Sequence, residues 1–134
     1  MRAVLDPNIL IAALLSRTGP PAQIVSRWLA GEFELVVSES LLAELRRALA
    51  YPKVRARVSA DEASEFVSLL AHAAILGSDP PTPARRSVDP GDDYLVALAE
   101  GERAVLVTGD RHLLDLAREL PIETARAFLE ILEG

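Results

Sequence analysis

Short apolar runs alternate along the chain with longer segments in which apolar residues recur at every third or fourth position. The apolar runs predict β-strands at 3–5, 33–37, 74–76, 104–107 and near Ile122. The periodic segments predict helices at 8–15 and 20–30, between Ser38 and Tyr51, from Ser59 or Asp61 to Ala73, at 92–100 and 110–120, and after a cap at Thr124. Strands that alternate with helices form parallel sheets covered on both faces. The sequence therefore predicts an α/β fold with a central parallel sheet, in a single domain spanning residues 1–134.

Proline, glycine and capping residues mark the joints between these elements. Pro20 and Pro21 preset the start of a helix, and Gly31 ends it. The proline-rich segment 78–86 predicts a loop, and Asp89 followed by proline has the pattern of a helix N-cap. We find no internal repeat, low-complexity segment or linker that would divide the chain.

The composition narrows the chemistry that such a domain can carry. Half of the 134 residues are apolar but only 4% are aromatic, so the core must be aliphatic. Cysteine is absent, which excludes a disulfide framework, a thiolate metal site and a thiol nucleophile. No apolar run is long enough to span a membrane, and the N-terminus lacks the layout of a signal peptide. We expect a cytoplasmic protein in which any metal is held by oxygen.

The net charge of −6 argues against a general nucleic-acid binder, but the basic residues are clustered. Between positions 45 and 60 the chain has no acid and carries Arg46, Arg47, Lys53, Arg55 and Arg57. A solvated helix face and a local site for a polyanion both fit this pattern.

Acidic residues follow two of the predicted strands. Asp6 comes directly after the first strand, and Asp110 follows the strand at 104–107. In parallel sheets, ligands bind beyond the carboxyl ends of the strands, which makes both acids candidate ligands. Each acid also precedes a predicted helix, so an N-cap is the structural alternative for both.

Glu44 is a third candidate acid, and it lies within a predicted helix. On a helical wheel of about 100° per residue it borders the apolar stripe of Leu41, Leu45 and Leu49. It also lies beyond the first turn, where the helix dipole would explain an acid. A functional carboxylate and a solvated one at the edge of the stripe both remain open.

Asp92 and Asp93 are adjacent acids in the first turn of the helix at 92–100. The helix dipole accounts for acids there, yet two adjacent negative charges repel, and a bound cation would relieve the repulsion. Asp92 aligns with Leu95 and Ala99, whereas Asp93 aligns with Val96 and Ala97. The periodicity does not decide which of the two faces a site.

Acids from several elements, gathered at one edge of a parallel sheet, would form a site for Mg²⁺ or Mn²⁺. Such sites hydrolyse phosphodiesters by polarising the phosphate and lowering the pKa of a bound water, and they need no protein nucleophile. His72 and His112 are expected to be surface or packing residues rather than ligands.

Four segments of the chain together resemble the PIN domain family, in particular the VapC-like toxin ribonucleases. They are VLDPNIL, SESLLAELRRAL, DPGDDYLVALA and VLVTGDRHLL, and the likeness extends to the closing TARAFLEIL. The resemblance implies a three-layer α/β/α fold, a Mg²⁺- or Mn²⁺-dependent endoribonuclease, a homodimer and a cognate antitoxin that blocks the site.

The resemblance also assigns roles to individual residues. Asp6, Glu44, Asp93 and Asp110 match the acidic quartet of the family, with Asp92 as an accessory ligand, and the family pattern ranks Asp93 ahead of Asp92. Asn8 and Thr108 match polar positions that orient the acids. On this interpretation the acids hold one or two divalent ions, and the RNA backbone is held by Arg46, Arg47 or Arg111.

One position departs from the family pattern. The residue after the first acid is usually Thr or Ser, and here it is Pro7. Proline has neither a hydroxyl nor a backbone N–H, so other groups must supply the hydrogen bonds that hold the neighbouring acids. Weakened or altered metal binding is the expected consequence if nothing replaces them.

Two other classes of protein fit parts of the sequence. A PIN-fold binding module without activity would keep the sheet and a partner surface but lose the metal geometry. A phosphotransfer domain also places Asp at the ends of strands. The dehalogenase type needs a second Asp where this chain has Asn8, and the receiver type needs a lysine late in the chain, where none is present.

Overall fold

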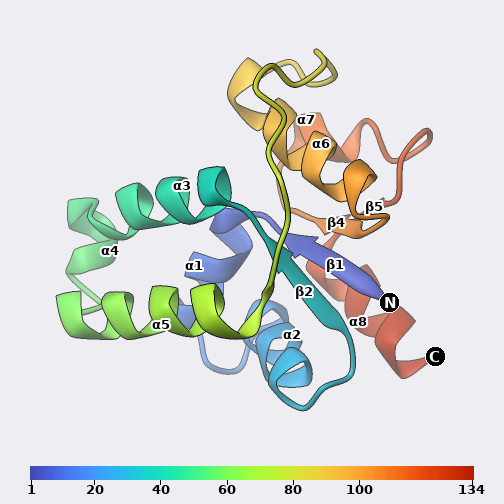
Figure 1. Cartoon of the computed structure of the whole chain (residues 1–134). Coiled ribbons are helices and arrows are strands. Elements are labelled where there is room, and N and C mark those ends of the chain that lie inside the picture. The colour runs from blue at the N-terminus through green and yellow to red at the C-terminus, as the bar shows by residue number, and fades with distance from the viewer.

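The centre of the molecule is a five-stranded parallel sheet with the strand order β3-β2-β1-β4-β5 (Figure 1). The computed structural model describes residues 1–134. Its strands are β1 (Arg2–Leu5), β2 (Glu34–Val37), β3 (Ile75–Leu76), β4 (Val105–Val107) and β5 (Ile122–Glu123). The predicted parallel sheet is confirmed, with strands close to the predicted positions.

Eight α-helices accompany the strands. They are α1 (Pro7–Leu15), α2 (Pro20–Leu29), α3 (Glu39–Leu49), α4 (Pro52–Arg55), α5 (Ala60–Ala73), α6 (Asp93–Gly101), α7 (Arg111–Leu114) and α8 (Ala125–Glu133). A 3₁₀ turn, η1 (Pro90–Asp92), precedes α6. None of these helices has the length and apolar character needed to cross a membrane.

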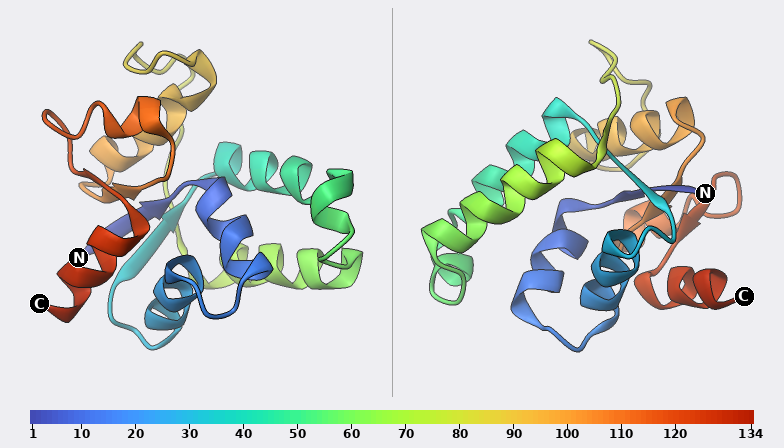
Figure 2. Two further views of the ribbon diagram at one scale, coloured as in Figure 1. Left: turned by 180° about the vertical axis from the view of Figure 1, so that it is seen from behind. Right: turned by 60° about the horizontal axis from the view of Figure 1, so that its bottom comes forward.

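Helices cover both faces of the sheet, which gives the expected three-layer α/β/α arrangement. Helices α1, α2 and α8 lie on one face (Figure 2), and α6 packs against β1 and β4 on the other. Helices α3 and α5 run antiparallel, with α4 joining them at the end furthest from the sheet (Figure 1). A long loop then leads from β3 to η1.

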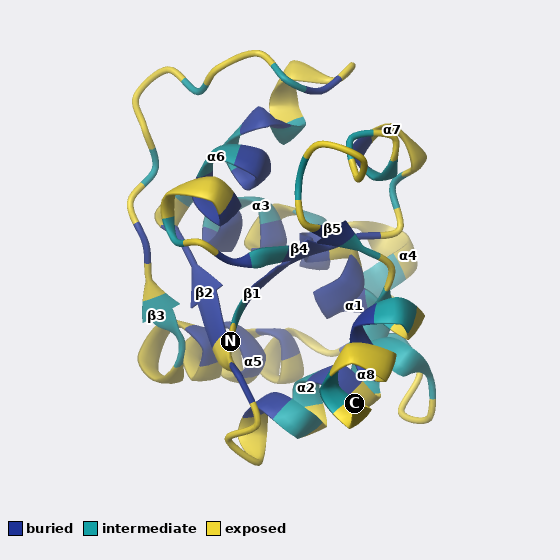
Figure 3. Cartoon of the chain, turned by 90° about the vertical axis from the view of Figure 1, so that its right-hand side faces the viewer, coloured by how far each residue is buried: buried dark blue, intermediate teal, exposed yellow.

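Aliphatic side chains form the core between these layers, as the low aromatic content predicts. The central strands are buried along almost their whole length (Figure 3). Two of the few aromatic residues, Phe33 and Phe128, meet edge to face with their ring centroids 5.1 Å apart. They fasten helix α8 to the start of β2.

Side-chain caps set where several helices begin. Ser38 Oγ accepts from the N–H of Leu41 at the start of α3, and Thr124 Oγ1 accepts from Ala127 at the start of α8. Ser59 forms a capping box with Glu62, so α5 starts after Ser59 and the alternative start at Asp61 is wrong. These hydrogen bonds satisfy N–H groups that have no partner within the helix.

The structure differs from the predicted elements in three places. The helix predicted at 110–120 is only the short α7, because from Leu116 onward most N–H groups bond to the carbonyl three residues back, in tight turns that precede β5. Helix α4 was not predicted, and it begins with proline at its first position. The α-helix predicted from Asp92 begins at Asp93, after the turn η1.

Candidate functional site

The ends of β1 and β4 lie side by side and bring Asp6 next to Thr108. Leu5 pairs with Val107 in the sheet, and the N–H of Asp6 donates to the carbonyl of Val107 at 3.0 Å. Thr108 Oγ1 donates to Asp6 Oδ2 at 2.8 Å and accepts from the N–H of Asp110 at 3.0 Å. One buried hydroxyl therefore links the two acids that follow these strands.

Asp6 is buried, and both of its oxygens accept hydrogen bonds. Oδ1 accepts from the N–H of Asn8 at 2.9 Å, and Oδ2 accepts from Thr108. Burial raises the pKa of Asp6, these two donors lower it, and the charge of Asp110 raises it further, so that the net pKa lies above the usual value. Asp6 is thus both the N-cap of α1 and a desolvated carboxylate, and the two interpretations do not exclude each other.

Pro7 leaves these hydrogen bonds intact. It occupies the first position of α1, where a backbone N–H would have no helical partner, and its ring is buried. Neither bond to Asp6 involves residue 7. Asn8 contributes through its backbone N–H, and its side chain is exposed, whereas Thr108 contributes through its hydroxyl.

Glu44 reaches the same edge of the sheet from helix α3. The hydroxyl of Tyr94 in α6 donates a hydrogen bond to Glu44 Oε2. Tyr94 was not among the residues predicted for the site. No pattern in the sequence indicates a bond between residues 50 positions apart, so only the packing of α6 beside α3 reveals it.

Asp92 is the member of the adjacent pair that faces the other acids. Burial raises its pKa to about 7, together with the negative charges of Asp110, Asp89, Asp6 and Glu44. It accepts no side-chain capping bond at the start of α6. Asp92 therefore lies in a region of uncompensated negative charge.

Asp93 points elsewhere, although the family pattern ranks it first. Its Oδ1 accepts from the N–H groups of Ser87 at 2.7 Å and Arg86 at 3.1 Å, and Arg85 Nε lies 3.1 Å from Oδ2. Burial raises its pKa, but these donors and the Arg85 charge outweigh that effect and leave the pKa below its usual value. In this structure Asp93 holds the 85–87 segment against α6, whereas the charges that raise the pKa of Asp92 include those of Asp110, Asp6 and Glu44.

Four acids are thus electrostatic neighbours at the carboxyl edge of the sheet, and we call them the acidic group: Asp6, Glu44, Asp92 and Asp110. None of them forms an ion pair. Their donor atoms are all carboxylate oxygens, which suit Mg²⁺ or Mn²⁺. Burial is the largest cause of the raised pKa of Asp92, and the neighbouring negative charges, which a cation would offset, add to it. No three acid or histidine side chains of the chain converge as a preformed metal cluster.

The arginines predicted to hold RNA come from two helices, with Arg46 and Arg47 in α3 and Arg111 at the start of α7. Arg46 lines a cavity of about 490 Å³ between α3, α4 and α5, together with Leu49, Arg55 and His72. Arg47 is exposed further along the same helix as Glu44, and Arg111 is exposed directly after Asp110. Arg111 is the one of the three that is adjacent in sequence to an acid of the group.

The sequence matches a known protein family and a relative from another organism. Residues 2–112 match the family model described as PIN domain. An uncharacterized protein of Methanocaldococcus jannaschii, MJ1680, is 23% identical over 143 residues, which covers 99% of this chain and 92% of the relative.

Solved structures share the fold at low sequence identity. PAE2754 from Pyrobaculum aerophilum has a TM-score of 0.69 and 21% identity, over 99% of this chain and 90% of that one. A structure of VapBC2 from Rickettsia felis, bound to a DNA fragment from the promoter of the pair, has a TM-score of 0.63 and 16% identity. The match covers 92% of this chain and 98% of that one. VapBC-1 from nontypeable Haemophilus influenzae has a TM-score of 0.62 and 19% identity, over 94% of this chain and 99% of that one.

Proposed function

Because this chain belongs to the PIN domain family, we propose that it is a divalent-metal-dependent endoribonuclease that hydrolyses RNA phosphodiester bonds. The acidic group carries the proposal. Separate elements contribute its four carboxylates, which form no ion pair, and burial together with the charges of the neighbouring acids raises the pKa of Asp92 to about 7. Unpaired carboxylates that repel one another are what an oxygen-ligated Mg²⁺ or Mn²⁺ site requires.

In this proposal the four acids bind the cation, and a neighbouring hydroxyl helps to position them. Asp6, Glu44, Asp92 and Asp110 would supply the ligands, and Thr108 keeps Asp6 and Asp110 at a fixed separation through its hydroxyl. A bound cation would polarise the scissile phosphate and lower the pKa of a water at the site. Arg111, exposed beside Asp110, can attract the RNA backbone, with Arg47 further along α3.

We place the protein as the toxin of a toxin–antitoxin pair, with single-stranded RNA as substrate, a cognate antitoxin as partner and a homodimer as the working unit. The fold shared with chains of the VapBC structures supports this placement. The negative charge of the chain as a whole fits an enzyme that contacts RNA locally better than one that coats it.

A PIN-fold binding module without activity is the second candidate. It is favoured by the absence of a preformed cluster of three converging acid or histidine side chains. Such a protein would keep its RNA or protein partners and would show no affinity for Mn²⁺.

One experiment separates the two functions. Mn²⁺ is titrated by calorimetry into the wild type, Asp92→Asn and Asp115→Asn, and each protein is incubated with a mixed-sequence single-stranded RNA. Asp115 is an exposed acid outside the group and serves as the matched control. Binding and cleavage that are lost only in Asp92→Asn support the nuclease. Intact RNA and no Mn²⁺ binding by the wild type would establish the binding module instead.

A further inference from the structure

Tyr94 connects helix α6 to helix α3 at the acidic group. Its ring is half-buried and packs against the hydrophobic core, which fixes the direction of the side chain. Its hydroxyl emerges at Glu44 Oε2 and donates a hydrogen bond there. Burial, this bond and the charges of Glu44, Asp6 and Asp92 raise the pKa of Tyr94, which shows that the hydroxyl lies among the acids.

Glu44 has no other side-chain partner. It forms no ion pair, and the bond from Tyr94 is the one side-chain hydrogen bond that it makes. Glutamate is a long side chain with several rotatable bonds, whereas tyrosine is rigid and loses little freedom when it is packed. The orientation of Glu44 is therefore set by Tyr94 more than by its own helix.

The side chain that donates to Glu44 carries no positive charge. Asp93, by comparison, is paired with the cationic side chain of Arg85. A tyrosine hydroxyl adds no positive charge and occupies one lone pair of Oε2. It orients Glu44 and leaves Oε1 without a protein partner.

We propose that Tyr94 is a positioning residue, whose hydroxyl holds Glu44 in the orientation in which its carboxylate serves a divalent cation. The inference rests on the proposed nuclease function and adds to it a residue that contacts neither cation nor RNA. Hydrogen-bond partners of metal ligands commonly account for a large share of the affinity for the metal.

The test uses the two tyrosines of the chain as a matched pair. Tyr94→Phe removes the hydroxyl and keeps the ring, and Tyr51→Phe makes the same change at an exposed position on the α3–α4 joint. We expect Tyr94→Phe to weaken Mn²⁺ binding by about 10-fold or more, within the range for partners of metal ligands. Tyr51→Phe should leave the dissociation constant unchanged.

A double-mutant cycle shows whether the effect passes through Glu44. In a Glu44→Gln background the same Tyr94→Phe change should have little further effect on Mn²⁺ affinity, because the carboxylate that it orients is gone. An equal loss in both backgrounds would overturn the positioning role, as would a Tyr94→Phe protein that binds Mn²⁺ like the wild type. In the last case the wild type would still bind and cleave, so the nuclease function would stand without the inference. A wild type that binds no Mn²⁺ would overturn both.

A second measurement observes Tyr94 with its hydroxyl in place. With 3-fluorotyrosine incorporated, the chain has two ¹⁹F resonances, and Tyr51→Phe assigns them. Addition of Mg²⁺ should shift the Tyr94 signal and leave that of Tyr51 in place. Saturation with Mg²⁺ that moves neither signal would contradict the proposal.

Discussion

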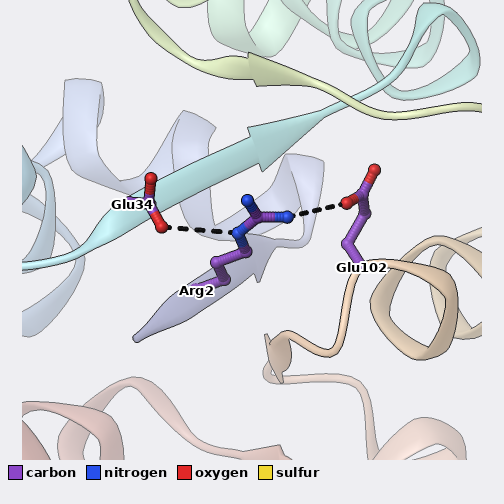
Figure 4. A network of polar contacts seen from close by, with 3 residues as sticks. All are labelled: Arg2, Glu34 and Glu102. Atoms are coloured by element: carbon purple, nitrogen blue, oxygen red, sulfur yellow. Dashed lines mark hydrogen bonds and ion pairs between the residues drawn. The ribbon is translucent and has the colours of Figure 1, made fainter.

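The acids at the two ends of the sheet have different partners: a cationic side chain at the amino end and neutral donors at the carboxyl end. At the amino end, Arg2 at the start of β1 lies between two glutamates (Figure 4), with Nε 3.3 Å from Glu34 Oε1 and Nη1 2.9 Å from Glu102 Oε2. At the carboxyl end, Asp6 and Asp110 are held by a threonine hydroxyl and by backbone N–H groups, with no cationic side chain.

This difference separates acids that have a cationic partner within the protein from acids that remain available to bind a cation. At the amino end, both glutamates are paired with the same arginine, so each has a cationic partner within the protein. At the carboxyl end, burial raises the pKa values of Asp6 and Asp92, the charge of Asp110 adds to both shifts, and no cationic side chain pairs with these acids. The same contrast separates Asp92 from Asp93, two neighbours in sequence with pKa shifts of opposite sign.

The largest expected effect is a difference in RNA cleavage rate between two variants, each with one acid replaced at one end of the sheet. Asp110→Asn keeps an oxygen that can cap His112 but removes a negative charge from the acidic group. We expect RNA cleavage to fall by more than about 100-fold, since partners of ligands alone account for ~10–100-fold. Glu102→Gln, at the amino end, should cleave at the wild-type rate. Equal rates for both variants in a fluorescent RNA assay would mean that Asp110 has no part in the reaction.

Mn²⁺ should stabilise the protein through the carboxyl end alone. At 100 times the dissociation constant, binding adds about 2.7 kcal/mol to the free energy of unfolding, which corresponds to a rise of roughly 8 °C in Tm for a chain of this size. Thermal melts of the wild type should show this rise, and EDTA should reverse it. Asp110→Asn should show none; an identical rise in that variant would indicate binding elsewhere.

Asp93→Asn should destabilise the fold where Asp92→Asn does not. The amide at position 93 would turn an N–H₂ group toward donors of the 85–87 segment and leave Arg85 without its carboxylate. We expect a loss of about 2 kcal/mol in urea titrations. Asp92→Asn removes repulsion and should unfold at the same urea concentration as the wild type or a higher one. The reverse order would exchange the roles assigned to these residues.

In metal-free protein the stability should fall as the pH rises from about 4 to about 7. The pKa of Asp92 is raised from 3.8 to about 7 by folding, so in this window the folded protein binds more protons than the unfolded chain. The free energy of unfolding therefore decreases with pH and levels off above the folded pKa. Melts in EDTA at several pH values should show this slope for the wild type and a smaller one for Asp92→Asn. An unchanged slope would assign it to another group.

The smallest effect is expected at the amino end. Arg2→Met removes two partly exposed ion pairs, which are worth about 1 kcal/mol or less together. Mn²⁺ affinity should not change, because Arg2 lies at the opposite end of β1 from Asp6. A weaker affinity in calorimetry would show that the two ends are coupled.

The strands, most helices and the acids that follow β1 and β4 could be predicted because they depend on local patterns. Alternating strands and helices imply a parallel sheet, and a parallel sheet places Asp6 and Asp110 at one edge. The choice between Asp92 and Asp93 could not be predicted, because both acids align with buried positions of α6, namely Leu95 and Val96. The choice depends on the N–H groups of Arg86 and Ser87, which donate to Asp93 from a loop that has no periodic pattern. Tyr94 was missed for the same reason: its partner lies on another helix.

The order of the strands also governs when the acidic group can form during synthesis. Strand β1 is made first, yet Thr108, which bonds to Asp6, follows 102 residues later. Chains emerge from the ribosome with the N-terminus first. An incomplete chain that ends before β4 carries Asp6 and Glu44 but lacks the hydroxyl and Asp110 that complete the group. The acidic group can therefore assemble only after β4 and Asp110 have been added to the chain, whatever part of the sheet has formed before them.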